Sequence, residues 1–211
     1  MRTPWHTPWA RRSGALAGAA VIAGGATAAA AQGIVFAAER QSWLTPQGVA
    51  MLFQQACIRT EAQSEPAVDW ALTQGFEPLD VLSGSASDLL EGQPGAVLAA
   101  PGSEGRVMLV VTQERRCTVW ARRVSGPALR LAVAEAVGRS SGGGARVQLQ
   151  LERNIERSGA WRNQMQWRYR AAGASLEFGL GAVTTLTAAP ATQALNMAPW
   201  QALAPDPITG R

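Results

Sequence analysis

Three segments in the second half of the chain alternate apolar and polar residues, and this pattern constrains the fold most. A side-chain period of two is typical of strands with one buried face and one wet face. The dipeptides Ser158-Gly159 and Ala172-Gly173 supply turn residues between the segments. The sequence therefore predicts a C-terminal three-stranded antiparallel meander. Its apolar positions are Val147, Leu149 and Leu151, then Met165, Trp167 and Tyr169, then Leu176, Phe178 and Leu180.

Two helices are predicted before the strands. Thr45 is a good N-cap, and Pro46 suits the first helical position. In a second helix, Ser64 is the predicted N-cap and Gly75 lies at the C-terminal end, where a left-handed residue belongs, so that Phe76 packs back onto the helix. The inward face of the first helix is predicted to carry Val49, Leu52, Phe53, Ala56 and Cys57, at helical spacing.

The middle of the chain completes an α+β pattern. Short apolar runs at 96–100, 107–112 and 117–124 predict strands, and 127–137 predicts a central helix. Segment 77–95 is rich in Gly, Ser, Asp and Pro, and we expect a long surface loop with one helical turn near 87–91. The fold class is thus predicted to be α+β, with two N-terminal helices, antiparallel strands, a central helix and the C-terminal meander.

The first 31 residues have the composition of a signal peptide. Arg2, Arg11 and Arg12 precede an uncharged, Ala-rich and Gly-rich run that ends in three alanines before Gln32. We therefore expect 1–31 to be a signal peptide and the protein to be periplasmic or secreted. Export by the Sec route fits, and Arg11-Arg12 is compatible with the Tat route. The alternative is an uncleaved anchor, which would be the protein's one contact with the membrane.

The rest of the chain divides in two. Residues 32–183 are expected to form a single α+β domain, since about 150 residues suffice for one core. Residues 184–211 are rich in Pro, Ala and Thr and are expected to form an irregular tail.

The two cysteines are expected to pair. Cys57 lies on the inward face of the first helix, and Cys117 shares a strand face with Val119. Two cysteines in an exported protein most often form a disulfide. A redox pair would usually have a C-x-x-C spacing, whereas these cysteines lie 60 positions apart. We predict a structural bridge from helix to sheet.

The composition after residue 31 excludes several kinds of chemistry. The chain has no lysine, and its one histidine, His6, lies in the predicted signal peptide. Triads, Cys-His pairs, Ser-Lys dyads and Schiff-base lysines therefore lack a required group, and two cysteines cannot make a zinc site. We expect no metal, no cofactor and no enzymatic activity. The chemistry left open is that of carboxylates, for which the sequence offers Asp69, Glu77, Asp80, Asp88 and Glu91.

Charge is distributed unevenly along the chain. Residues 32–105 hold 2 Arg and 9 acidic residues, a net charge of −7, whereas 106–170 hold 13 Arg and 4 acidic residues, a net charge of +9. Such an asymmetry serves an anionic partner or self-association. The alternative is two surfaces of one domain that neutralise each other.

Part of the chain resembles small exported alphaproteobacterial proteins of uncharacterised function. The resemblance rests on a Cys near the end of the first helix, on Gly75-Phe76 and on the strand motif Cys117-Thr118-Val119, and it extends over 46–183. It implies an exported, disulfide-linked protein and transfers no catalytic residues.

Arginines gather around the last predicted hairpin and mark the candidate binding face. Guanidinium groups beside an exposed aromatic ring hold phosphate, carboxylate or sugar groups. The alternative is an ordinary solvated face, with Arg168 paired to Glu152 or Glu177. The predicted face consists of Arg157, Trp161, Arg162, Arg168 and Arg170.

The function expected from these features is that of an exported, non-catalytic binding or accessory module of the cell envelope. Its partner is expected to be an anionic envelope component or an envelope protein, and not nucleic acid. The alternatives are a His-independent hydrolase that works with carboxylates and a structural subunit of an envelope complex.

Overall fold

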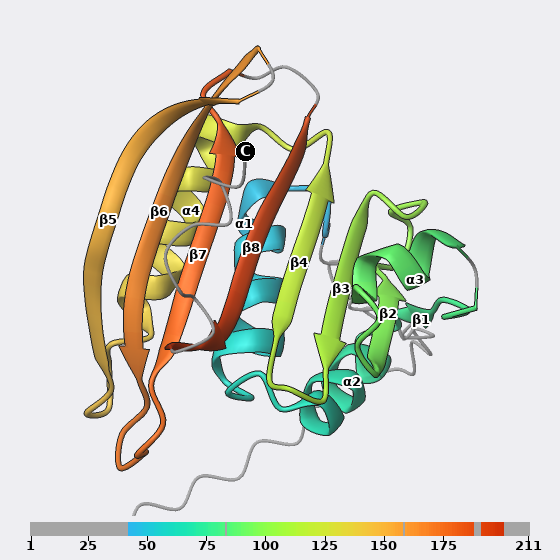
Figure 1. The fold of residues 1–211 in the computed structure, drawn as a ribbon, viewed down its shortest axis with the longest axis horizontal. Helices are drawn as coiled ribbons and strands as arrows, with labels where there is room; N and C mark the ends of the chain where they lie inside the picture. The colour runs from blue at the N-terminus through green and yellow to red at the C-terminus, as the bar shows by residue number, and fades with distance from the viewer. Residues whose placement is uncertain (1–41, 83, 158, 188–190, 201–211) are drawn as a thin grey trace, which may run out of the picture. The chain divides into compact units, whose positions relative to one another are not determined.

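The computed structural model describes residues 42–82, 84–157, 159–187 and 191–200. They form one eight-stranded sheet, in the order β1-β2-β3-β4-β8-β7-β6-β5, and every neighbouring pair is antiparallel (Figure 1). With its helices, this sheet confirms the predicted α+β class. The predicted signal peptide lies outside the described residues, so its cleavage stays a prediction. Within the described part of the chain, no helix is long and apolar enough to cross a membrane.

Helices cover one face of the sheet. They are α1 (Pro46–Leu52), the π-helix η1 (Phe53–Ile58), α2 (Ser64–Thr73) and α4 (Gly126–Arg139). As predicted, Thr45 caps α1, since its Oγ1 accepts a hydrogen bond from the Gly48 N–H at 3.0 Å. The η1 segment contacts α4 through Gln54, whose Nε2 donates to the Ala136 carbonyl at 3.1 Å. The main core forms between these helices and the inward side chains of the strands.

The end of α2 follows its sequence signal. Gly75 adopts φ +79°, and the Phe76 N–H donates to the Ala71 carbonyl at 3.0 Å. Phe76 then packs edge-to-face on Trp43, with ring centroids 5.2 Å apart, and Trp70 completes this aromatic cluster.

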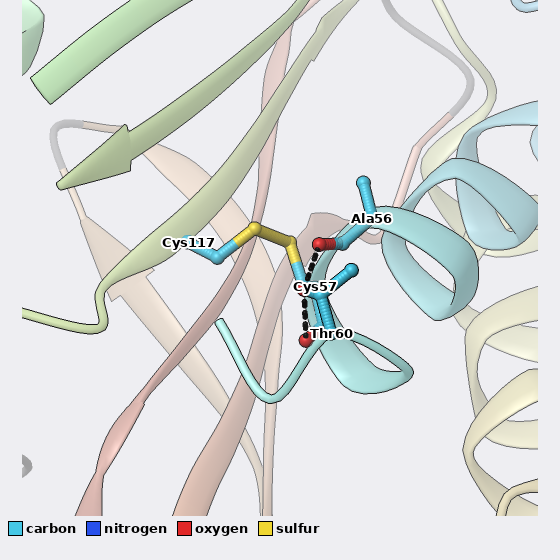
Figure 2. The surroundings of a disulfide bond; sticks show 4 residues. All are labelled: Ala56, Cys57, Thr60 and Cys117. Carbon is cyan, nitrogen blue, oxygen red and sulfur yellow. Dashed lines mark hydrogen bonds between the residues drawn. A yellow bond between two sulfur atoms is a disulfide. The ribbon is translucent and has the colours of Figure 1, made fainter. Parts of the chain in front are cut away.

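The predicted disulfide is present. Cys57, in η1, is bonded to Cys117, the first residue of β4, with their Cα atoms 5.5 Å apart (Figure 2). Both residues are fully buried. One turn beyond Cys57, the Thr60 hydroxyl donates to the Ala56 carbonyl at 2.6 Å and lies 3.4 Å from the Cys57 carbonyl (Figure 2). The bridge therefore joins the helical layer to the middle of the sheet.

The first half of the sheet contains β1 (Glu77–Pro78), β2 (Gly95–Ala99), β3 (Val107–Thr112) and β4 (Cys117–Arg122). The expectation of a long loop over 77–95 was incomplete, because β1 and the helix α3 (Gly84–Leu90) lie within it. Ala86 and Leu90, one helical turn apart, are buried against Val97 and Val110. Since Leu98 and Leu109 face the main core, α3 lies on the opposite face of the sheet from the other helices.

The second half is a four-stranded meander rather than a three-stranded one. Its strands are β5 (Arg146–Arg157), β6 (Ala160–Arg170), β7 (Phe178–Thr185) and β8 (Thr192–Pro199). From β4 the chain crosses through α4, on one face of the sheet, to the far edge, and β5 to β8 then return strand by strand until β8 pairs with β4 (Figure 1).

The prediction of an irregular tail over 184–211 was wrong for β8, and the predicted domain end at 183 was too early. This strand has only two large apolar residues, Leu195 and Met197, among alanines and beside prolines. Its backbone pairs with β4 on one side and β7 on the other, and that pairing outweighs a weak strand propensity. The described part of the predicted tail thus joins the two halves of the sheet.

A bulge changes the predicted faces of β5. The pairing with β6 shifts register between Leu149 and Leu151, so that Leu149 lies opposite Trp167 but Leu151 lies opposite Gln166. The alternation predicted for Val147, Leu149 and Leu151 therefore breaks, since a bulge reverses the side-chain direction beyond it. Leu149 is also 49% exposed, as befits a residue of an edge strand.

Candidate functional site

The even-numbered residues of β6 point away from the helical layer. Met165, Trp167 and Tyr169 are buried in the main core, so Arg168 and Arg170, which alternate with them, project from the opposite face. This was the orientation predicted from the sequence. We call this helix-free side of β5, β6, β7 and β8 the open face.

At one end of the open face, three arginines surround a hollow of about 210 Å³. Register explains their proximity, because Arg146 lies opposite Arg170 and Gln148 lies opposite Arg168. The lining consists of Arg146, Gln148, Arg168, Arg170 and Glu177, and we call it the arginine hollow. Three guanidinium groups against one carboxylate leave a net charge of +2.

Glu177 and Trp200 fix two of these side chains. Arg168 donates from Nε to Glu177 Oε2 at 2.7 Å, and Arg170 Nη1 lies 3.9 Å from Glu177 Oε1. The Trp200 ring lies beneath the Arg168 guanidinium, with 5.5 Å between Cζ and the ring centroid. No carboxylate forms an ion pair with Arg146 among the described residues. Arg146 is therefore the cation most available to a ligand.

The two carboxylates predicted as alternative partners of Arg168 pair with different arginines in the structure. Arg168 pairs with Glu177, whereas Glu152 pairs with Arg130 of α4 on the helical side. The hydrogen bond from Arg130 lowers the pKa of Glu152 below its ordinary value of 4.5. Glu152 is thus held away from the arginine hollow.

The other predicted members of the face lie elsewhere. Arg162 shares the open face but is six residues from Arg168, about 20 Å along a strand. Its Nη1 lies 3.4 Å from the Thr192 carbonyl. Trp161 is 54% exposed on the opposite side of the strand, and Arg157 pairs with Ala160 at the far end of the hairpin. The side chain of Arg157 lies outside the description.

Three contributors were missed from the sequence: Arg146, Gln148 and Trp200. If the β5–β6 pairing ran without a bulge from the hairpin pair Arg157–Ala160, Arg146 would lie opposite Ala171, and its side chain would point to the helical side of the sheet. Only the register shift near Leu149 places it beside Arg170. The sequence predicts Glu177 as a cross-strand partner of Arg168, and that pairing is confirmed.

A larger hollow of about 660 Å³ lies at the other end of the same side of the sheet, beside α3. Its apolar residues are Leu79, Ala86, Leu89, Met108 and Trp120, and its charged residues are Asp88, Glu91, Glu104 and Arg122. A second hollow of about 210 Å³ shares Leu89, Glu91 and Trp120 with it and extends toward Thr112, Thr118 and Asn196. We call the two together the α3 groove.

The α3 groove collects part of the acidic cluster noted in the sequence. Asp88 and Glu91 line it and are joined by Glu104, whereas Asp69 and Glu77 do not line it. All three lining carboxylates are exposed. Within the described ranges, no three His, Cys, Asp or Glu side chains lie close enough to hold a metal ion.

Comparison with known proteins adds little. No protein-family model matches the sequence, and no curated protein matches it. Among solved structures, the solution structure of cyanobacterial PsbP (CyanoP) from Synechocystis sp. PCC 6803 is similar at 10% identity and a TM-score of 0.28. The match covers 59% of this chain and 69% of that one. A likeness of that size transfers neither a ligand nor a role.

Proposed function

We propose that the chain is an exported, non-catalytic binding module of the cell envelope, and that the arginine hollow binds a phosphate-bearing anionic group such as a lipid head group. The observation that carries this proposal is the convergence of Arg146, Arg168 and Arg170 around one hollow that contains a single carboxylate. Guanidinium groups match phosphate oxygens in geometry and in charge.

Two features support export to the periplasm or beyond. Disulfides persist in oxidising compartments, such as the periplasm. The buried bond between Cys57 and Cys117 is a disulfide, and it therefore supports export. The Arg-led, Ala-rich segment before Gln32 has the order of a signal peptide. Outside the cytoplasm the available polyanions are envelope lipids and glycans rather than nucleic acid.

The surroundings of the carboxylates favour binding over hydrolysis. A carboxyl that acts as a general acid near neutral pH needs an apolar environment to keep its proton. Asp88, Glu91 and Glu104 are exposed at the rim of the α3 groove.

A purely structural role has less support. Such a role would leave a contiguous apolar surface for a neighbouring subunit. The exposed large apolar side chains described fall in small groups on different elements: the consecutive Val81 and Leu82, Trp161 with its neighbour Leu186, and single residues such as Leu72 on α2.

Co-sedimentation of the purified full chain with lipid vesicles tests the proposal. We expect binding to phosphatidylglycerol vesicles and none to phosphatidylcholine vesicles. Binding should weaken as salt rises from about 0.01 M to about 0.15 M, because the screening length falls from about 30 Å to about 8 Å. Free inorganic phosphate as competitor separates recognition of the phosphate group from recognition of the membrane surface.

A charge-matched pair of variants provides the control. Arg146→Gln with Arg170→Gln removes two charges from the hollow, and we expect at least a tenfold loss, since each arginine near an anionic surface contributes about 1 kcal/mol. Arg59→Gln with Arg139→Gln removes two charges, one from the C-cap of η1 and one from the end of α4. Equal binding by the two double variants would refute the proposed site.

A further inference from the structure

The α3 groove differs from the arginine hollow in size, polarity and charge. Its larger part, about 660 Å³, falls in the range of small-molecule sites. Met108 of β3 and Trp120 of β4, which point to the α3 side of the sheet, lie across its floor, and Ala86 and Leu89 of α3 line its wall. An apolar floor with an aromatic ring favours a ligand with an apolar stem.

The charge of the lining residues favours a ligand of positive charge. Asp88, Glu91 and Glu104 stand against Arg122 around the larger hollow, a net charge of −2, and Arg116, which lines the smaller hollow, brings the whole α3 groove to −1. Glu104 lies 3.6 Å from Arg106, whereas the described residues place no arginine within ion-pair distance of Asp88 or Glu91. The carboxylates of Asp88 and Glu91 are thus available to a cation.

A buried hydroxyl group without a partner adds an independent observation. Thr112 lines the smaller hollow, is 5% exposed, and its Oγ1 has no hydrogen-bond partner among the described residues. Buried polar side chains are normally hydrogen-bonded, so an orphaned hydroxyl beside a hollow points to a polar group that enters it.

We infer that the α3 groove is a second binding site, distinct from the arginine hollow, for an organic cation that carries an ammonium or guanidinium group on an apolar stem. The stem lies along Leu89 and Trp120, whose ring face also attracts a cation. The cationic group lies at Asp88 and Glu91, and a second polar group of a longer ligand reaches Thr112.

Titration of the full-length ¹⁵N-labelled chain with three probes tests this inference. Hexylamine, hexanol and hexanoate share one stem and differ in charge. We expect hexylamine to shift the Trp120 indole and Leu89 amide resonances saturably, with hexanol at least about threefold weaker and hexanoate weaker still. Equal affinities for the three probes, or no shift of these resonances, would overturn the inference.

Two neutralising variants localise the effect. Asp88→Asn is expected to weaken hexylamine binding about two- to fivefold, as suits one exposed ion pair. Glu156→Gln makes the same charge change on β5, outside the groove, and should leave binding unchanged. If Asp88→Asn binds hexylamine as wild type does, the cation does not lie at this carboxylate and the inference fails. Loss of lipid binding at the arginine hollow would leave this result unaffected, so the two proposals fail separately.

Discussion

The side-chain amide of Gln193 makes two hydrogen bonds to Thr185. Its Oε1 accepts from the Thr185 backbone N–H at 2.8 Å, and its Nε2 donates to the Thr185 hydroxyl at 3.0 Å. The same Nε2 lies 3.3 Å from the carbonyl of Val124, just before α4. Gln193 is fully buried, so one amide ties β8 to the end of β7 and to the start of the crossover helix.

Replacing Gln193 with Leu should destabilise the fold by about 2 to 4 kcal/mol. The change leaves the Thr185 N–H and the Val124 carbonyl buried without a partner, and each orphaned group costs about 1–3 kcal/mol. Urea unfolding measures the loss. Gln148→Leu, an exposed Gln to Leu change on β5, is the control and should stay within about 0.5 kcal/mol of wild type. Similar losses in both variants would contradict the role assigned to Gln193.

Removal of the disulfide should lower the free energy of unfolding by an amount at the upper end of that range. The bridge closes a loop of 60 residues, for which the chain-entropy model gives about 4 kcal/mol. We expect the Cys57→Ala, Cys117→Ala double variant to lose roughly that much in urea unfolding. Reduced wild-type protein serves as the matched reference and should unfold at the same urea concentration as the double variant. Two free thiols in native, unreduced protein would contradict the bridge itself.

Tyr169 offers a test of burial by pH. Burial raises the pKa of its phenol above the ordinary value of 10.0, and the charge of Glu61 raises it further. It is the chain's only tyrosine, so tyrosinate absorbance reports it alone. A raised folded pKa favours the neutral phenol, so its contribution to stability is complete below pH 10 and is lost as pH rises toward the folded pKa. We expect a higher titration midpoint in native protein than in urea.

Glu61→Gln separates the two causes of that shift. The midpoint should fall but stay above the midpoint of the unfolded chain, because burial is the larger cause. Identical midpoints in native protein and in urea would show that Tyr169 is not buried.

Export makes a prediction about the N-terminus. Protein recovered from the envelope fraction should begin at or near Gln32, because the preceding alanines suit a signal peptidase. N-terminal sequencing decides between cleavage and anchorage. Recovery of chains that begin at Met1 would favour the anchor.

The sequence predicted elements well where local signals and packing agree. The cap at Thr45, the left-handed Gly75 and the two cysteines each carry a local reason for their structure, and each prediction is confirmed. The strand faces of β6 were predictable because seven successive side chains, at 164–170, keep strict polar–apolar alternation.

The errors arose where pairing between distant segments decides the structure. β8 has little strand propensity of its own and is defined by its position between β4 and β7. The bulge near Leu149 leaves no clear signal in the sequence, yet it alone brings Arg146 to the arginine hollow. Of the predicted binding face, Arg168 and Arg170 therefore line the arginine hollow, whereas Trp161 lies on the other side of the sheet.

The most direct test of anion binding observes the arginines themselves. The full chain, with ¹⁵N-labelled arginine, is titrated with short-chain phosphatidylglycerol, and the Nε–Hε resonances are followed by NMR. Short-chain phosphatidylcholine is the control lipid. The proposed function predicts that Arg146, Arg168 and Arg170 shift together and saturably with phosphatidylglycerol, while Arg59 and Arg139 do not move. Uniform small shifts of all arginines, or no shifts in the hollow, would contradict it.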